Sequence, residues 1–311
     1  MLEDGLTTKT DLFAGKKFDI EHSLGLMADG FVTLPARMIY DNERLGPNQA
    51  IIRKCHIYMI GLVPTVVRNV DAFAVNGGFR EVLSVGGLER TIDWQLTDGR
   101  ILEKSGDRFF VREADGRTSY PNDVQTTTRL KSLGLYNFEV LYIGQAFGAG
   151  GSRNALTRLR KHETLQKISL NGLPKDHDLY VLMIEVKRAN NLFTFINPNA
   201  QQQSEGDRID NGLQVLFTID DAQRTALFEA AFIRYFEPEY NKTFKDSFPS
   251  TNQKCLEECY AKDFSAIGAE IHIDGMPFTL SSAKVAPKDG HSAFFDLHSD
   301  ESRQVFFTAG T

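Results

Sequence analysis

Residues 138–168, FEVLYIGQAFGAGGSRNALTRLRKHETLQKI, constrain the fold more than any other stretch of the chain. Their pattern predicts a buried strand, then a glycine-rich loop, then a basic helix. The glycines do not form a dinucleotide-binding fingerprint, because Arg153 occupies the position of its third glycine, and no register supplies the Gly-Lys-Ser/Thr of a phosphate loop. A glycine-rich loop is also an ordinary turn, so the loop alone assigns no function.

Positive charge is concentrated around this segment, although the chain as a whole is acidic. The 311 residues have a formal charge of −6, which argues against a general affinity for nucleic acid. Residues 129–167 contain seven Lys and Arg against two Glu, a local charge of +5 that leaves −11 on the remainder. We therefore expect this segment to face a negatively charged ligand, although a solvated helix face would explain the charge equally well.

Three regions are expected along the chain, which is long enough for two domains or for one domain with large insertions. Residues 1–125 are predicted to be strand-rich, because apolar runs alternate with turn signals up to a boundary at YPND. Residues 126–245 mix strands and helices. Residues 246–311 are predicted to form a helix and a β-hairpin that turns at Asp274-Gly275.

A cytoplasmic location is expected from three features of the sequence. No run of 18 or more apolar residues is present, so a membrane span is not expected. The start, MLEDGLTTKTDLF, is polar and acidic and lacks the pattern of a secretory signal. The three cysteines cannot all pair within one chain, which fits a reducing compartment. The sequence leaves open whether the protein forms a homo-oligomer.

The basic helix carries an arginine and a histidine four residues apart. Arg158 and His162 should therefore project from the same face of that helix. Such a pair can hold a phosphate and share or polarise a proton. An ordinary surface pair is the alternative.

A second helix is expected over residues 222–236, AQRTALFEAAFIRYF, between aspartate caps and Pro238. Glu229 is its only carboxylate, and the residues three and four positions away offer no cation. Burying an unpaired carboxylate costs several kcal/mol, so Glu229 is expected to meet a metal ion, a distant arginine or water in a cleft. The carboxylate oxygens of Glu229 are hard ligands of the kind that Mg²⁺ prefers.

With these residues the chain resembles the GIY-YIG nuclease family, and most of all its restriction-endonuclease branch. The resemblance covers about 126–245, or some 40% of the chain. The matching residues occur in the order of the family's motifs: Tyr142-Ile143-Gly144 on a strand, Arg158 and His162 on the next helix, Glu229 on a later helix, and Asn241 in EPEYN just after it.

The resemblance implies an α+β fold, with a small mixed sheet flanked by helices and strand-rich extensions at both ends. It also implies cleavage of a phosphodiester with one bound divalent cation, Mg²⁺ or another such as Mn²⁺. Glu229 would hold the metal, and Arg158 would stabilise charge on the phosphoryl oxygens. Tyr142 would orient or deprotonate the attacking water with help from His162, and Asn241 would tie the cleft together by hydrogen bonds.

The first tyrosine of the family pattern is harder to place. It should lie on a strand beside Tyr142, and Tyr136 is the nearest candidate in sequence. Six residues of extended strand span about 20 Å, which is too far for a shared site. Either a tight turn near Asn137 brings the two together, or the first tyrosine is Tyr120 or Tyr58, with a long insertion between the motifs. The lysine that usually follows YIG in the family is here Gln145.

The expected function is a metal-dependent DNA endonuclease of restriction or phage-defence type. The sequence does not distinguish a DNA substrate from RNA or branched DNA. Four basic residues are expected to contact the nucleic acid: Arg153, Arg160, Lys161 and Lys167. The alternative is a catalytically inactive nucleic-acid-binding or protein-interaction module on a degenerate nuclease scaffold.

Overall fold

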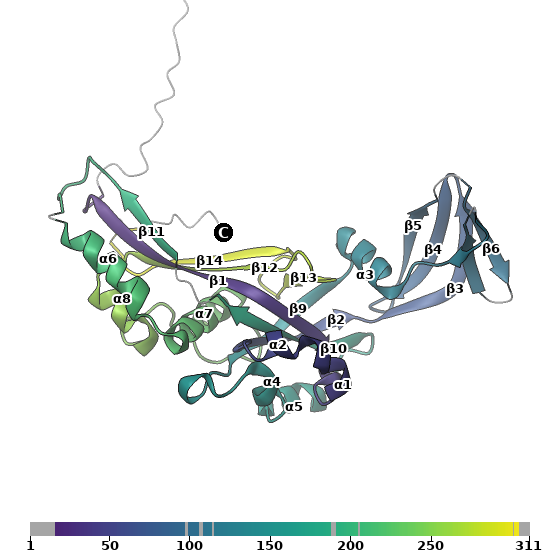
Figure 1. The fold of residues 1–311 in the computed structure, drawn as a ribbon, viewed down its shortest axis with the longest axis horizontal. Coiled ribbons are helices and arrows are strands. Elements are labelled where there is room, and N and C mark those ends of the chain that lie inside the picture. Colours follow the sequence, from purple (N-terminus) through teal and green to yellow (C-terminus); the bar gives the residue numbers. More distant parts are fainter. Residues whose placement is uncertain are drawn as a thin grey trace, which may run out of the picture.

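One eight-stranded mixed sheet forms the centre of the structure, a computed structural model that describes residues 16–96, 99–105, 108–113, 115–187, 191–204, 206–300 and 302–304 (Figure 1). The strand order is β13-β9-β2-β10-β1-β12-β14, and β11 pairs with β1 beside this path. The bounds of these strands are β1 (Ile20–Pro35), β2 (Ile57–Pro64), β9 (Asn137–Gln145), β10 (His177–Val186), β11 (Asn191–Ile196), β12 (Ala266–His272), β13 (Thr279–Ser281) and β14 (Gly290–Asp296).

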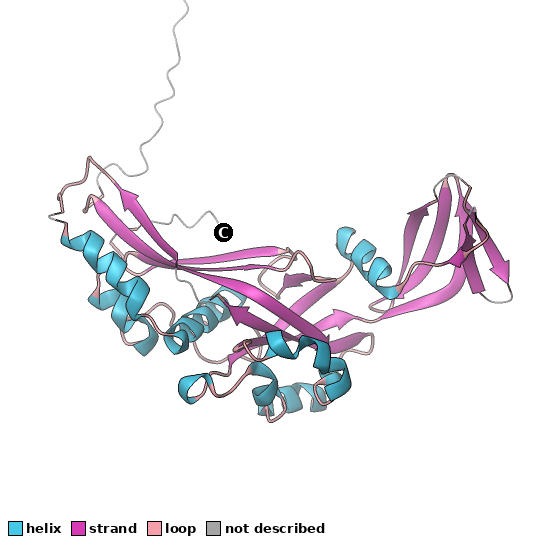
Figure 2. Ribbon diagram, in the orientation of Figure 1, coloured by secondary structure: helices cyan, strands magenta, loops and turns pink. Residues whose placement is uncertain are grey.

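Helices lie against this sheet, so the expected α+β class is confirmed, although the sheet is larger than the small one expected (Figure 2). The helices of this part are α1 (Asn42–Leu45), α2 (Gln49–Ile52), α4 (Ala155–Leu159), α5 (Glu163–Leu170), α6 (Asp207–Thr218), α7 (Asp221–Phe236) and α8 (Glu257–Ala261). The 3-10 turns are η1 (Ala36–Met38), η2 (Gly46–Asn48), η3 (Ala149–Gly151) and η4 (Lys254–Leu256). Within the described residues, no helix is both long and apolar enough to cross a membrane.

Strand β2 is buried on both faces, which explains its near-continuous apolar sequence IYMIGLVP. Ile57 and Met59 share a core cluster with the apolar side of α7. Tyr58 and Ile60 point to the opposite face and share a cluster with α4 and α5. Along this part of β2, odd-numbered side chains therefore face α7 and even-numbered side chains face α4 and α5.

A β-bulge interrupts the antiparallel pairing of β2 with β9. Ile60 lies opposite Tyr142, but Gly61 lies opposite Val140, so Leu141 is an extra residue in β9. Without the bulge, the side chains of residues 140 and 142 would point to the same face. Because of it, Val140 belongs to the core under α7, whereas Tyr142 packs with the cluster of α4 and α5.

A long arm, the inserted arm of residues 65–136, separates β2 from β9 in the sequence. It forms two three-stranded antiparallel sheets, which project away from the main sheet in Figure 1. Only Thr65 stands between β2 and the first strand of the arm. The arm consists of β3 (Val66–Val75), β4 (Gly78–Val85), β5 (Leu88–Gln95), β6 (Ile101–Ser105), β7 (Arg108–Arg112), β8 (Thr118–Ser119) and α3 (Asp123–Ser132).

The structure does not follow the expected division at residues 125 and 245. The main sheet takes β1 and β2 from before the first boundary, and β12, β13 and β14 from after the second. The two strands on either side of Asp274-Gly275 exist as β12 and β13, but they do not pair with each other as the expected hairpin requires: β12 pairs with β1 and β14, and β13 pairs with β9. Apolar runs show where strands lie but not which distant strands pair.

The close approach of β2 to β9 predicts a strong effect of Gly61→Ala. A Cβ at Gly61 would lie 2.3 Å from the carbonyl oxygen of Glu139 and 2.3 Å from Cε1 of Phe138, so the strands must separate to admit it. We expect the free energy of unfolding, measured by urea denaturation, to fall by about 1–3 kcal/mol. Gly46→Ala is the control, because a Cβ there meets nothing within 4 Å. Equal stability of the two variants would contradict this packing.

Candidate active site

Two tyrosines lie side by side on the paired strands β2 and β9. The ring centroids of Tyr58 and Tyr142 are 6.2 Å apart, and the two side chains are joined by a hydrogen bond. Tyr58 is only 1% exposed, whereas Tyr142 is partly exposed. The bulge in β9 is what turns Tyr142 toward Tyr58, so this pair depends on the irregular register.

The glycine of the YIG sequence makes room for both rings. Gly144 lies opposite Tyr58 across the strand pair. A Cβ at this position would lie 2.5 Å from the hydroxyl oxygen of Tyr58 and 2.8 Å from Cε1 of Tyr142. Any larger residue would therefore push the two tyrosines apart.

The basic segment is two short helices rather than the single one expected. Helix α4 ends at Leu159, and His162 is the N-cap of α5, with φ −91° and ψ 112°. Arg158 and His162 are thus not successive residues of one helix face. The cause is local: the Nδ1 atom of His162 accepts a hydrogen bond from the backbone N–H of Leu165, which starts a new helix.

The break still brings His162 to the tyrosines. Its ring centroid lies 5.3 Å from that of Tyr58 and 5.0 Å from that of Tyr142. Burial, and then the positive charge of Arg158, lower the pKa of His162 to about 4, so the ring is neutral at pH 7. Because Nδ1 accepts a bond from a backbone N–H, the single proton is on Nε2.

Arg158 is exposed and hydrogen-bonded to the hydroxyl group of Tyr58. Within the described part of the chain it forms no ion pair with a carboxylate, so its charge remains available to a ligand. Burial raises the pKa of Tyr142, the negative charge of Glu229 adds to this rise, and Arg158 opposes it. Burial likewise raises the pKa of Tyr58.

Glu229 lies on α7, which packs on the other face of the sheet, but it is close enough for its negative charge to act on the hydroxyl groups of Tyr58 and Tyr142. It is 9% exposed, and its carboxylate accepts hydrogen bonds from the side chain and the backbone of Gln145, at the end of β9. Burial raises the pKa of this carboxyl to about 7, against the opposing effect of those hydrogen bonds. Among the described residues no Lys, Arg or His forms an ion pair with Glu229, so the distant arginine that the sequence left open is not found there.

Asn241 covers the second half of β9 on the side where β13 pairs only with residues 137–139. Its Oδ1 accepts a hydrogen bond from the N–H of Ile143 at 2.9 Å, and its Nδ2 donates one to the carbonyl of Ile143 at 2.8 Å. The N–H of Tyr240 bonds to the carbonyl of Leu141 at 3.0 Å. The segment after α7 therefore acts like a short neighbouring strand, and it fixes Tyr142 between two tied residues.

Tyr136 does not belong to this group, which corrects one of the expected site residues. It packs in the core under α7 and is hydrogen-bonded to Tyr180. Tyr120 packs against Phe79 in the inserted arm. Of the three tyrosines that the sequence left open, Tyr58 is thus the one beside Tyr142. The missing signal was strand pairing across the inserted arm, which a linear sequence does not display.

The expected ligand-binding cations differ in their surroundings. Arg153, Lys161 and Lys167 are exposed. Arg160 is instead engaged within the protein, because its Nε donates to the carbonyl of Ile39 and its Nη2 to Oδ1 of Asn42, both at 2.8 Å. Arg160 therefore holds the segment around α1 and is less available to a ligand.

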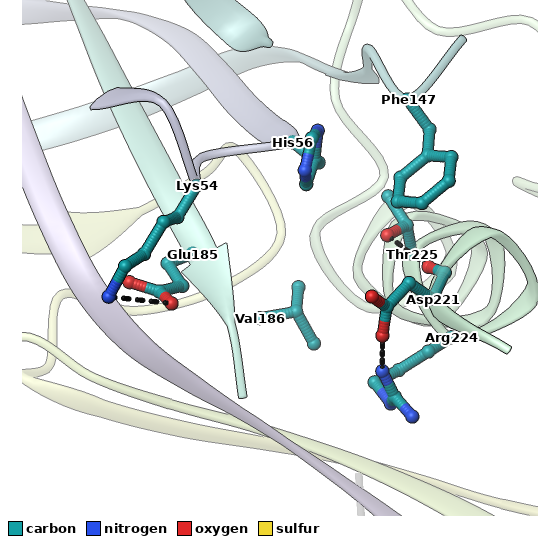
Figure 3. Close-up of a pocket in the computed structure, with 8 residues that line it drawn as sticks. All are labelled: Lys54, His56, Phe147, Glu185, Val186, Asp221, Arg224 and Thr225. Atoms are coloured by element: carbon teal, nitrogen blue, oxygen red, sulfur yellow. Dashed lines mark hydrogen bonds and ion pairs between the residues drawn. The ribbon is translucent and has the colours of Figure 1, made fainter. Parts of the chain in front are cut away.

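A small pocket adjoins the site near the N-terminal end of α7 (Figure 3). Thr225, one turn before Glu229, lines it, and its volume of about 20 Å³ suits a water molecule rather than a nucleotide. Figure 3 shows two ion pairs in its wall, Lys54 with Glu185 and Arg224 with Asp221. The wall of the pocket is thus close to neutral.

A metal ion would have to use few protein ligands. In the parts of the chain that the structure describes, no three His, Cys, Asp or Glu side chains lie close enough to bind one ion together. Glu229 is a buried carboxylate with no cationic partner there, which suits a hard cation that keeps several waters.

Comparisons of the chain with protein-family models, with curated proteins and with solved structures found no match. A function is therefore inferred from the chemistry of the site.

The raised pKa of Glu229 predicts a pH-dependent stability. The folded carboxyl holds its proton up to about pH 7, against 4.5 for an ordinary glutamate. Without metal, the wild type should lose stability relative to Glu229→Gln as pH rises from about 4.5 to about 7, and the gap should then stay constant. Urea unfolding in EDTA should show a gap of about 3 kcal/mol. A gap that does not vary with pH would mean that this carboxylate is already stabilised in its charged form.

Proposed function

We propose that this protein is a metal-dependent endonuclease of the GIY-YIG type that hydrolyses phosphodiester bonds in DNA. One observation carries the proposal: β2, β9, the α4–α5 segment and α7 each contribute to one cluster of two tyrosines, an arginine, a histidine and a carboxylate. Packing alone gives no reason to bring together an arginine and a carboxylate that, among the described residues, form no ion pair.

Glu229 is the residue that would hold the divalent cation, Mg²⁺ or Mn²⁺, with water and a phosphate oxygen completing its ligands. When bound, the cation supplies positive charge that activates a water molecule, stabilises the phosphoryl oxygens and lowers the pKa of Tyr142. The hydrogen bonds from Gln145 would keep the carboxylate aimed at the site.

Arg158 would bind the scissile phosphate. Its guanidinium has no competing carboxylate among the described residues, and the hydroxyl of Tyr58 fixes its position. Planar guanidinium groups match phosphate oxygens with two parallel hydrogen bonds, which become stronger as negative charge builds up in the transition state.

Tyr142 would orient the attacking water and accept its hydrogen bond, since it is the more exposed of the two tyrosines. His162 would act as a neutral donor rather than as a base, because its Nδ1 is already occupied and its Nε2 carries the proton. Such a donor stabilises negative charge on a neighbouring oxygen without adding a full positive charge.

The surrounding charge supports a nucleic-acid substrate. The exposed Arg153, Lys161 and Lys167 lie on the segment that carries Arg158, while the rest of the chain is acidic. This arrangement would repel nucleic acid except along the basic segment. We favour DNA in a restriction or phage-defence role, in a cytoplasmic protein whose three cysteines are all free thiols.

Loss of Glu229 should abolish cleavage. We expect Glu229→Ala to cut plasmid DNA in Mg²⁺ at least about 10³-fold more slowly than wild type, because a bound metal supplies several kcal/mol to the transition state. Glu239→Ala, which removes an exposed carboxylate just after the same helix, is the control and should cut normally. If wild type and both variants bind DNA but none cuts it, the inactive binding module is the better description.

The identity of the first tyrosine is tested by a matched pair of variants. Tyr58→Phe removes the hydroxyl that bonds to Arg158 and Tyr142, and kcat should fall by on the order of 10²-fold. Tyr136→Phe removes a hydroxyl outside the cluster, and kcat should stay within about threefold of wild type. A larger loss in Tyr136→Phe than in Tyr58→Phe would contradict the assignment.

A further inference from the structure

His56 stands two residues before Tyr58, directly before the first residue of β2, and the sequence analysis gave it no role. Its Nδ1 lies 3.0 Å from the carbonyl oxygen of Ala146 and 2.9 Å from that of Arg153. Carbonyl oxygens only accept hydrogen bonds, so Nδ1 carries a proton and donates to both.

These two carbonyls mark the two ends of the glycine-rich loop, residues 147–153. The backbone N–H of Arg153 bonds to the carbonyl of Phe147 at 3.1 Å and closes the loop on itself. The ring of Phe147 packs on the imidazole, with centroids 4.7 Å apart, and both line the small pocket in Figure 3. One side chain therefore holds both ends of this loop.

The backbone on either side of His56 strengthens the same connection. The N–H of Ala146 bonds to the carbonyl of His56 at 2.7 Å, and the N–H of Ala155 bonds to the carbonyl of Cys55 at 2.8 Å. Ala155 is the first residue of α4, and Ala146 directly follows Gln145. The start of β2 is thus tied to the end of β9 and to the start of α4.

We propose that His56 is a positioning residue of the active site. Three groups depend on the elements that it joins: Tyr58 on β2, Arg158 on α4, and Gln145, the hydrogen-bond partner of Glu229, at the end of β9. The proposal rests on the proposed nuclease function. The Nδ1–H group of His56 keeps the glycine-rich loop closed. The closed loop in turn sets the distance between Arg158 on α4 and Gln145, the hydrogen-bond partner of Glu229.

Two variants of His56 separate this role from a general effect on folding. The amide nitrogen of asparagine is two bonds from Cβ, like Nδ1 of histidine, so His56→Asn keeps a donor in place. The amide nitrogen of glutamine lies one bond farther, at the place of Nε2, so His56→Gln loses the donor to the loop while retaining a polar side chain. Lys54→Ala, which changes the same pocket without touching the loop, is the control.

Two readouts are needed, kcat for DNA cleavage at saturating substrate and hydrogen exchange of the peptide that contains residues 147–155 in the free protein. His56→Gln should lower kcat by on the order of 10²-fold with little change in KM, since small displacements of positioned groups have costs of this size. It should also speed exchange in the loop. His56→Asn and Lys54→Ala should resemble wild type in both readouts.

The outcomes distinguish this inference from the nuclease proposal. If His56→Gln matches His56→Asn in both kcat and exchange, the positioning role is overturned. If His56→Asn keeps slow exchange but loses kcat, the ring itself contacts the reaction and the positioning role is again overturned. If wild type does not cut DNA at all, the nuclease proposal fails, and the exchange data alone show whether His56 closes the loop.

Discussion

The antiparallel pairing of β2 with β9 is the constraint on which the rest of the site depends. Each strand brings one tyrosine, and the bulge at Leu141 places both rings on the same face of the sheet. The helices then approach from around this pair, with α4 and α5 over the rings and α7 over the other face. A shift of one residue in the register would turn one tyrosine into the opposite core and dissolve the site.

The site is also built at a cost in stability. Glu229 is buried with hydrogen bonds from Gln145 but without a described cationic partner, and Arg158 remains exposed without a described carboxylate. Arg158 and Glu229 carry opposite charges but do not form an ion pair with each other. Each of them acts electrostatically on Tyr58 and Tyr142. Perturbed, incompletely paired charges of this kind are typical of functional sites, and under the proposed function a metal ion and a phosphate would complete them.

The sequence predicted the individual elements better than their connections. Tyr142, Arg158, Glu229 and Asn241 could be singled out as candidates because each has a local context: a strand, a basic segment, an apolar helix with one carboxylate, and the turn after that helix. The division into regions does not match the sheet, and the sequence could not choose among Tyr136, Tyr120 and Tyr58, because strand partners across 70 residues leave no local pattern.

The break between α4 and α5 was missed for a different reason. A histidine four positions after an arginine fits a continuous helix as well as it fits an N-cap, and only the hydrogen bond to Leu165 distinguishes the two.

The inserted arm has a consequence for how the chain folds. Tyr58 and Tyr142 are 84 positions apart, so the ribosome completes the arm before the second tyrosine exists. Each doubling of an unstructured connection adds about 0.6 kcal/mol to the entropic cost of closing it. The arm pairs mainly with itself through neighbouring strands, so it can form early and hold its two ends together. An insertion that separates β2 from β9 in the sequence would then act as the template on which the two strands meet.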